Sequence, residues 1–373
     1  MTSPRFFAVV AVAMATAIGL AGCAIERAPV PRVAKDVLAT ELPLQRVSKL
    51  LTLSDEVMTD LVAAEQPGCS AAVSVRGDVL WAAAAGLADL ASREPLTTES
   101  RFDMASVSKQ FTATAILLLQ QDGLLSLNDP VARHVDGLPR WANQVTLEQL
   151  MHHTARVPEF WRELENAGIG FSDPADHASV LAAIARDDEL VEGDGYAYSN
   201  SHYVLLARVV ENVSGQRFAD VIEERIAEPL GLDLPLGPGL VAPDVATPYD
   251  ADLAELRGGW TAYGHSGIIT TPTELVRWGD QYRLGELVQG DIAAEAALVL
   301  DENDQPNGEL YAAGLRIEPD GSLYHSGRWG GYLSDFTVTP DRETVIAVAC
   351  NREGAPRFEI ADALHELWAQ RSR

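Results

Sequence analysis

A serine and a lysine stand three residues apart in the segment Ser106-Val107-Ser108-Lys109. On a helix these two side chains would lie on one face, because positions i and i+3 are neighbours. A serine hydroxyl becomes an effective nucleophile when a nearby base takes its proton. A lysine can be that base when burial or a neighbouring positive charge lowers the pKa of its amine. The spacing therefore predicts that Ser106 is a nucleophile activated by Lys109, and the alternative is an ordinary surface lysine.

Lysine is scarce in this chain, which contains only Lys35, Lys49 and Lys109. After Lys49 the chain otherwise uses arginine, whose guanidinium stays protonated and is a poor general base. A titratable amine at Lys109 therefore favours a catalytic role. A compositional bias toward arginine would by itself still leave a few lysines.

A second polar group is Tyr198-Ser199-Asn200, just before a predicted helix. Tyr198 could exchange a proton with Ser106 or with a leaving group if cations lower its pKa. Asn200 could form hydrogen bonds to the substrate and to Lys109. The alternative is a tyrosine packed at a helix start, with Ser199 or Asn200 as the N-cap.

A third group is His325-Ser326-Gly327, followed by Arg328 at the end of a predicted strand. The edge of such a strand could hold a substrate by backbone hydrogen bonds, and Gly327 would let it approach closely. The backbone N–H groups of Arg328 and Ser106 could together form an oxyanion hole. His265-Ser266-Gly267 has the same letters but precedes a strand-to-helix transition, so we interpret His265 as structural or as a support of the site.

The segments around these groups predict mixed α and β structure. Two β-prone runs, 69–76 and 79–86, flank Gly77-Asp78 and are typical of a hairpin. Residues 106–121 form a strongly apolar helix that ends before Gly123. Further helices are expected at 146–152, 175–186, 201–213, 217–227, 273–283 and 356–370, and strands at 310–317, 322–327, 332–339 and 344–350.

This order of elements predicts an α+β fold. The first hairpin and the last strands would join in one antiparallel sheet flanked by helices, with a helical subdomain inserted at about 127–235. Residues 46–373 would form this catalytic domain.

The net charge of 28 − 54 = −26 argues against nucleic acid as a partner, because nucleic acid selects basic surfaces. It also argues against electrostatic adhesion to anionic lipid. No cluster of cysteine and histidine has zinc-ligand spacing, and the side chains of the adjacent pair His152-His153 do not share a helix face. We expect no metal and no cofactor.

The N-terminus predicts export. Residues 6–20 are almost free of polar side chains, but they are too few to cross a bilayer, which needs about 20 apolar residues. They are typical of a secretory signal, here residues 1–22. Leu20-Ala21-Gly22-Cys23 resembles a bacterial lipobox, so we expect lipid on Cys23 and anchoring to a membrane, with 23–45 as a tether. An ordinary signal peptide or an uncleaved anchor is the alternative.

Five segments carry a resemblance to a known family: FDMASVSKQFTA (102–113), LMHHT (150–154), YSNSHYVLL (198–206), EPLGL (228–232) and HSGRWGGYLSDFTVTPD (325–341). In this order they resemble the serine β-lactamase and penicillin-binding-protein superfamily, for which S-x-x-K is a signature. The nearest branch is similar to class C β-lactamases, D-alanyl-D-alanine carboxypeptidases and related esterases. The resemblance runs from about Gln66 to the C-terminus.

The resemblance implies a role for each group. Ser106 would be the acylated nucleophile, Lys109 and Tyr198 would share proton transfer, and Asn200 would be a polar positioner. The backbone N–H groups of Ser106 and Arg328 would be the oxyanion donors. The substrate would be an ester, an amide or a β-lactam, of small-molecule or peptide type, and the cell wall would be one source of it.

Two departures limit what carries over from the family. His325 stands where the lactamases have a lysine, so a substrate carboxylate would be held less firmly unless Arg328 substitutes for that cation. This histidine resembles the esterase and peptidase-like branches. Ala155-Arg156 replaces the Ser-Gly of many relatives, which affects the rim of the pocket. A catalytically silent binder of cell-wall peptides, or a transpeptidase, remains an alternative function, and we expect a monomer.

The fold that the resemblance implies also gives the remaining cysteines a role. Cys69 opens the first strand and Cys350 closes the last. If these strands are antiparallel neighbours, the two residues lie close together and can form a disulfide. The alternative is two buried free thiols.

Overall fold

The structure is a computed structural model, and it describes residues 26–27, 44–237, 242–285, 287–288, 297–300 and 306–369. The predicted signal peptide (1–22), the predicted lipidation residue Cys23 and most of the predicted tether (23–45) lie outside the described residues. Among the helices of the described ranges, none has the length and apolar character needed to cross a bilayer.

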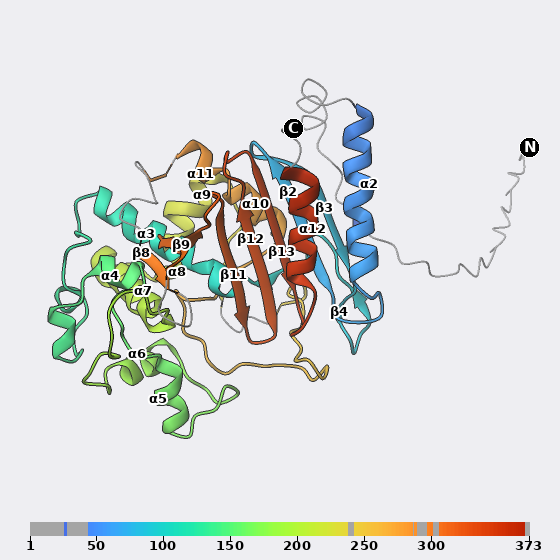
Figure 1. The fold of residues 1–373 in the computed structure, drawn as a ribbon. Helices are drawn as coiled ribbons and strands as arrows, with labels where there is room; N and C mark the ends of the chain where they lie inside the picture. The colour runs from blue at the N-terminus through green and yellow to red at the C-terminus, as the bar shows by residue number, and fades with distance from the viewer. Residues whose placement is uncertain are drawn as a thin grey trace, which may run out of the picture.

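An antiparallel sheet forms the centre of the fold (Figure 1). Within the described residues it has nine strands, in the order β1-β3-β2-β13-β12-β11-β10-β9-β8. The early strands β2 and β3 lie beside the late strands β13 and β12, which confirms the predicted α+β sheet. The strands are β1 (Glu26–Arg27), β2 (Cys69–Val75), β3 (Asp78–Ala85), β8 (Ala297–Leu300), β9 (Pro306–Ala312), β10 (Leu315–Ile317), β11 (Leu323–Trp329), β12 (Tyr332–Val338) and β13 (Thr344–Cys350).

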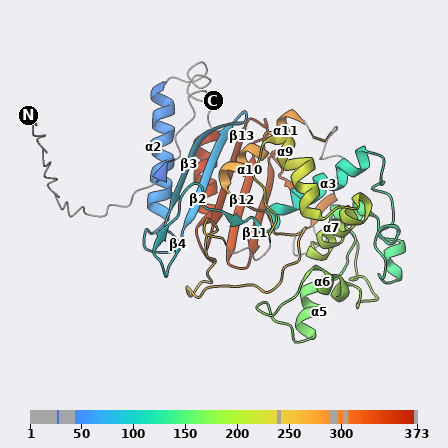
Figure 2. The ribbon, with the colours of Figure 1, turned by 180° about the vertical axis from the view of Figure 1, so that it is seen from behind.

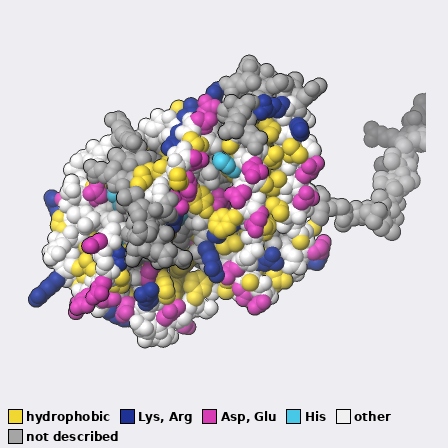
Figure 3. Space-filling model, viewed as in Figure 1, with side chains coloured by type: hydrophobic (Ala, Val, Ile, Leu, Met, Phe, Trp, Pro, Cys, Tyr) yellow, Lys and Arg dark blue, Asp and Glu magenta, His cyan; other side chains and the backbone are white. Residues whose placement is uncertain are grey.

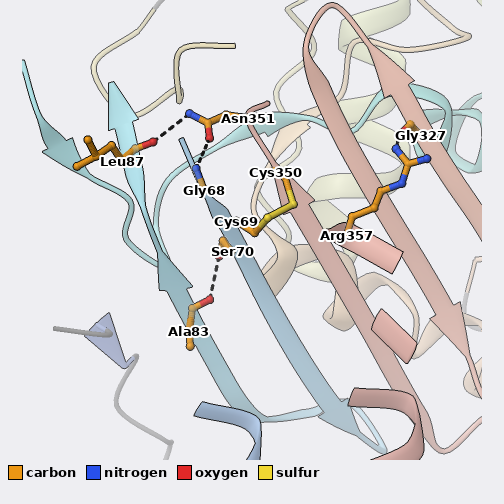
Figure 4. The surroundings of a disulfide bond; sticks show 9 residues. All are labelled: Gly68, Cys69, Ser70, Ala83, Leu87, Gly327, Cys350, Asn351 and Arg357. Atoms are coloured by element: carbon orange, nitrogen blue, oxygen red, sulfur yellow. Dashed lines mark hydrogen bonds between the residues drawn. A yellow bond between two sulfur atoms is a disulfide. The ribbon is translucent and has the colours of Figure 1, made fainter. Parts of the chain in front are cut away.

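The junction between the two halves of the sheet is the pair β2 and β13. Every residue of both strands is buried, as expected for central strands covered on both faces. Their register places Cys69 opposite Cys350, and the two form a disulfide across 281 residues of sequence, with Cα atoms 4.0 Å apart (Figure 4).

One face of the sheet is covered by α2 (Leu44–Leu61) and α12 (Arg357–Ala369), which lie side by side (Figure 1). Their buried side chains Met58, Leu364 and Trp368 pack on the apolar face of β2, β3 and β13. The indole N–H of Trp368 donates to Ser54 Oγ and so links the two helices. Helix α2 was not among the helices predicted from the sequence.

The other face carries α3 (Lys109–Gln121) and α10 (Pro272–Trp278). All residues of α3 from Lys109 to Ile116 are buried, as predicted for a helix between two layers. A helical region beyond α3 lies at the end of the sheet away from α2 (Figures 1 and 2). It contains α4 (Leu147–Met151), α5 (Phe160–Asn166), α6 (His177–Ile184), α7 (Asn200–Ser214), α8 (Phe218–Ile222), a π-helical turn (Glu223–Ala227) and α9 (Glu228–Leu230).

Two predicted elements are interrupted. The strand predicted at 310–317 is a hairpin, in which β9 and β10 turn at Ala313-Gly314, and both turn residues have positive φ. A Cβ on Gly314 would lie 2.6 Å from the carbonyl carbon of Lys109, so this turn needs glycine to lie against α3. The helix predicted at 273–283 is broken into α10 and α11 (Gln281–Leu284).

The surface shows how the negative charge is distributed. Acidic side chains are spread over the face in Figure 3, with basic ones between them. A distributed charge of −26 favours solubility.

Candidate active site

Ser106 lies on a short 3-10 turn, Ala105–Ser108, which leads directly into α3. The prediction of an α-helix starting at Ser106 was wrong in this detail. Ala105 has a φ of 47°, a left-handed conformation that costs a non-glycine residue about 1–2 kcal/mol. Asp103 stabilises this turn, because its Oδ1 accepts from the N–H groups of Ala105 at 2.8 Å and Gly267 at 3.1 Å.

Asp103 ends a two-residue strand, β6 (Phe102–Asp103), which pairs with β7 (Ile269–Thr270). The side chain is buried, and burial raises its pKa to about 6. Asp103 lies in the segment 102–113 that resembles the family, but the sequence did not predict a role for it. Its partners are the backbone N–H groups of Ala105 and Gly267, which only the fold brings close to it.

Gly327 lets strand β11 lie directly against the Ser106 turn. A Cβ at this position would lie 2.7 Å from Met104 O and 2.8 Å from Ala105 Cβ. Ser334 on the neighbouring strand donates a hydrogen bond to the same Met104 carbonyl at 2.7 Å. The missing side chain of Gly327 makes room for the Met104–Ala105 backbone. The close approach of a substrate at Gly327 stays a prediction.

Lys109 is fully buried, and its Nζ has three polar neighbours. It lies 3.0 Å from Ser106 Oγ, 2.8 Å from Asn200 Oδ1 and 2.9 Å from the carbonyl oxygen of His265. Burial lowers the pKa of Lys109 to about 7, against the opposing effect of Glu159 and Asp103. The amine is therefore available in its neutral form near pH 7.

The three contacts determine what a neutral Lys109 can do. A neutral amine has two N–H donors and one lone pair. The side-chain oxygen of Asn200 and the carbonyl of His265 can only accept, so they take both donors. The lone pair is then left for the hydroxyl proton of Ser106. This is the geometry of a general base. It also gives His265 a supporting contact through its backbone.

Tyr198 donates a hydrogen bond to Ser106 Oγ at 2.9 Å. Lys109 Nζ lies 5.0 Å from the centre of its ring, yet burial raises the pKa of Tyr198 above its ordinary value. The condition that cations lower this pKa is therefore not met. Tyr198 is a neutral hydroxyl donor, and Lys109 is the better base of the two.

Beneath Tyr198 lies a pair of buried histidines. The ring of His153 lies 4.2 Å from that of Tyr198, and its Nδ1 is 2.9 Å from His202 Nδ1. His202 Nε2 accepts from the N–H of Val157, so its Nδ1 carries the proton and donates to His153. Burial lowers the pKa of both histidines, and the neutral pair packs under the tyrosine.

Asn200 begins α7, and Ser199 occupies the N-cap position without a side-chain capping bond. The capping acceptor is Glu159 instead: its Oε1 accepts from Asn200 N at 2.9 Å and from Asn200 Nδ2 at 3.2 Å. Glu159 was not among the site residues predicted from the sequence. The available signal was a carboxylate within the apolar run Val157-Pro158-Glu159-Phe160-Trp161.

His325 is buried and bonded to the protein on both sides of its ring. Its Nδ1 lies 2.7 Å from the carbonyl of Ser326, so Nδ1 carries the proton, and Nε2 accepts from Tyr311 OH at 3.0 Å. Burial lowers the pKa of His325 to about 3, and the nearby Lys109 adds to this effect. His325 is therefore an uncharged support and cannot replace the cation of the lactamases.

The side chain of Arg328 points away from Ser106. It is 68% exposed and pairs with Glu353 at 3.0 Å. Alternation along β11 places Arg328 on the face of α12, opposite to His325 and Gly327. Arg357 of α12 contacts the Gly327 carbonyl from that face (Figure 4). The idea that Arg328 substitutes for the missing cation is wrong.

The backbone N–H of Arg328 does not follow the direction of its side chain. Gly330 and Gly331, with φ of 54° and 88°, form a two-residue hairpin turn, and Trp329 pairs with Tyr332. In such a hairpin the closing pair is hydrogen-bonded and the next pair is not. The N–H of Arg328 is then directed away from β12, toward the edge of β11 that β10 pairs only at Leu323 and Tyr324. This orientation supports the proposed oxyanion donor.

A cavity of about 280 Å³ lies beside Asp103 and Trp329. Asp103, which holds the Ser106 turn, and Trp329, next to Arg328, both line it. The rest of the wall includes the aromatic side chains of Phe171, Trp260 and Tyr332. It also includes Arg257, whose guanidinium pairs with Glu255.

Comparison with known proteins gives consistent results. Penicillin-binding protein 4* of Bacillus subtilis (strain 168) is 28% identical over 338 residues, covering 79% of this chain and 71% of that protein. Protein flp of Staphylococcus aureus (strain COL) is 26% identical over 315 residues; this covers 78% of this chain but only 61% of flp. D-amino acid amidase from Ochrobactrum anthropi SV3, solved with L-phenylalanine amide, has the same fold: the TM-score is 0.72 at 21% identity, over 87% of this chain and 100% of the amidase.

The family model described as Beta-lactamase matches residues 55–369. This range contains strands β2 to β13 and every residue of the site. The chain therefore belongs to the beta-lactamase family, within the superfamily of serine acyl-enzyme hydrolases and penicillin-binding proteins.

Proposed function

We propose that this protein hydrolyses an ester or amide bond through an acyl-enzyme on Ser106. Lys109 takes the hydroxyl proton as Ser106 Oγ attacks the substrate carbonyl. The developing oxyanion accepts hydrogen bonds from the backbone N–H groups of Ser106 and Arg328. Tyr198 gives its hydroxyl proton to the leaving group and regains one from Lys109, which carries the proton taken from Ser106. Water then gives a proton to the neutral Lys109 and attacks the Ser106 ester, and Ser106 Oγ regains a proton as the acid leaves.

The observation that carries this proposal is the environment of Lys109. Its amine is fully buried, has a pKa lowered to about 7, and has its lone pair free for Ser106. A silent binder of cell-wall peptides would not need a desolvated lysine with both N–H groups occupied, so this arrangement supports activity over binding alone.

The charges around the site support a preference for uncharged esters and amides. His325 is neutral, and the guanidinium of Arg328 pairs with Glu353 on the far face of the sheet. Neither can bind the carboxylate found in β-lactams and D-Ala peptides. The cavity beside Asp103 contains four aromatic side chains and offers room for an apolar group of the substrate, and Arg257 in its wall is paired with Glu255. We therefore rank an esterase or amidase above a β-lactamase or a D-alanyl-D-alanine carboxypeptidase.

The protein's location and assembly also belong to this proposal. We propose that it is exported and held at the membrane by lipid on Cys23, and that it acts as a monomer. A Cys23→Ala variant should move from the membrane fraction to the soluble fraction. Continued membrane association of that variant would contradict the lipid anchor.

A substrate panel tests the proposed activity. Purified full-length protein is assayed with p-nitrophenyl butyrate, nitrocefin and a D-Ala-D-Ala peptide, with Ser106→Ala as the control. We expect turnover of the ester that is lost in Ser106→Ala. Silence on all three substrates would favour the binder, and turnover confined to nitrocefin or the peptide would contradict the preference for uncharged substrates.

A further inference from the structure

Glu159 directly precedes α5 and lies behind the site, out of contact with Ser106. Its side chain is largely buried, and burial raises its pKa above the ordinary value. One oxygen, Oε1, accepts two hydrogen bonds from Asn200, from the backbone N–H and from Nδ2. The other oxygen, Oε2, has no hydrogen-bond partner among the described residues.

These bonds determine which way the amide of Asn200 faces. An asparagine amide has one accepting end and one donating end, and a carboxylate oxygen only accepts. Because Nδ2 of Asn200 donates to Glu159 at 3.2 Å, the oxygen Oδ1 must face the other way, toward Lys109 Nζ at 2.8 Å.

The orientation of the amide in turn determines what the lone pair of Lys109 meets. With Oδ1 toward Lys109, the amine donates one N–H to Asn200 and the other to the carbonyl oxygen of His265. Its lone pair then faces Ser106. If the amide were reversed, Nδ2 would donate to the lysine lone pair. Lys109 could then no longer accept the proton of Ser106.

We propose that Glu159 is a positioning residue that locks the Asn200 amide with its oxygen toward Lys109, and so keeps the lysine lone pair directed at Ser106. This inference rests on the proposed function, because it assigns a role within the same acylation step. It goes beyond that function by naming a residue that touches neither the nucleophile nor the substrate.

The charge of Glu159 has a second, separable effect. A carboxylate near an amine stabilises the protonated form, and Glu159 is the strongest of the effects that raise the pKa of Lys109 against burial. The other titratable groups around Lys109 are the carboxyl of Asp103, the tyrosines Tyr198 and Tyr203, and the histidines His153, His202, His265 and His325. Arg162 is the further charge that acts on Glu159 itself.

Two substitutions separate the orienting effect from the charge effect. Glu159→Gln removes the charge and offers Asn200 an amide that can face either way. Glu159→Asp keeps the charge but shortens the reach to Asn200. The matched control is Glu163→Gln on the same helix, because the Glu163 carboxylate bonds to Asn166 at the surface.

The experiment measures kcat/KM for p-nitrophenyl butyrate against pH with full-length protein. For Glu159→Gln we expect a loss of about tenfold to a hundredfold, typical of a misaligned reacting group, and a shift of the acidic limb to lower pH. For Glu159→Asp we expect a loss of rate with the acidic limb in its original place. Glu163→Gln should match the wild-type profile.

The outcomes distinguish this inference from the proposed function. A Glu159→Gln profile that keeps the wild-type rate or the wild-type acidic limb would overturn the inference and leave the serine hydrolase intact. If Glu159→Gln does not fold, as judged by circular dichroism, a wild-type rate in Glu159→Asp would overturn it instead. No acylation of Ser106 in the wild-type protein would refute the proposed function, and the inference with it.

Discussion

Lys109 Nζ lies 3.0 Å from Ser106 Oγ, although the two residues belong to different kinds of helix. Ser106 is on a 3-10 turn and Lys109 is the first residue of α3. The 3-10 turn changes to the α-helix α3 between Ser106 and Lys109. Removal of the amine should therefore remove the base while α3 remains in place.

The variant Lys109→Met tests the base. Methionine has a similar length and no titratable group, so kcat/KM should fall by about 10²–10⁴-fold, the usual contribution of a general base. The control is Lys49→Met on the exposed side of α2, which should retain wild-type activity. Ester turnover by Lys109→Met at the wild-type rate would show that another group activates Ser106.

The hydroxyl of Tyr198 is tested by Tyr198→Phe, which keeps the ring on His153 and removes the donor to Ser106. We expect a loss of kcat of about 10²-fold or more, with little change in thermal stability. Tyr196→Phe is the matched control, because the Tyr196 hydroxyl is buried without a hydrogen-bond partner among the described residues. Equal activity of both variants would exclude a role for Tyr198 in proton transfer.

The pH dependence of kcat/KM follows from the lowered pKa of Lys109. The reactive form is the neutral amine, and burial lowers its pKa to about 7. As the pH falls below that value, the amine is protonated, so kcat/KM should fall about tenfold per pH unit. Above it the profile should be level until another group titrates. A profile without an acidic limb from about pH 5 to about pH 8 would contradict a lysine base.

Gly327→Ala tests the close approach of β11 to the Ser106 turn. The added Cβ would lie 2.7 Å from the Met104 carbonyl oxygen, which must move together with the adjacent Ala105. We expect a loss of stability of about 1–3 kcal/mol in urea titrations and a larger loss of activity. The control Gly170→Ala meets no atom closer than 3.4 Å, and it should change neither property.

The Cys69–Cys350 disulfide joins the two strands at the centre of the sheet. Replacing both cysteines with serine should lower the free energy of unfolding by about 2–5 kcal/mol. Urea titrations with and without dithiothreitol measure this. The reductant should destabilise the native chain and leave the double variant unchanged. Equal midpoints for the native chain under both conditions would contradict a stabilising bridge.

The sequence predicted the sheet from patterns that repeat over several residues. The β-prone runs 69–76 and 79–86 around Gly77-Asp78, and the Gly, Pro and Asp turns of the last third, were sufficient for β2, β3, β12 and β13. The hairpin of β9 and β10 was not predicted. Its turn needs a positive φ at Ala313, and alanine is not a residue type that indicates this conformation.

Within the site, the residues that carry chemistry could be predicted from the sequence. The structure places Ser106, Lys109, Tyr198 and Asn200 in contact. The supporting residues could not be predicted. Glu159 lies 41 positions before Asn200, so its contact depends on tertiary packing. The orientation of Arg328 depends on the register of β11, and a one-residue slip would have reversed it.

Acylation of Ser106 can be observed by mass spectrometry of the protein quenched during ester turnover. We expect a mass increase equal to the acyl group, located by peptide mapping on Ser106, and absent from Ser106→Ala. An adduct on another residue, or ester turnover by the wild-type protein that Ser106→Ala retains in full, would contradict it.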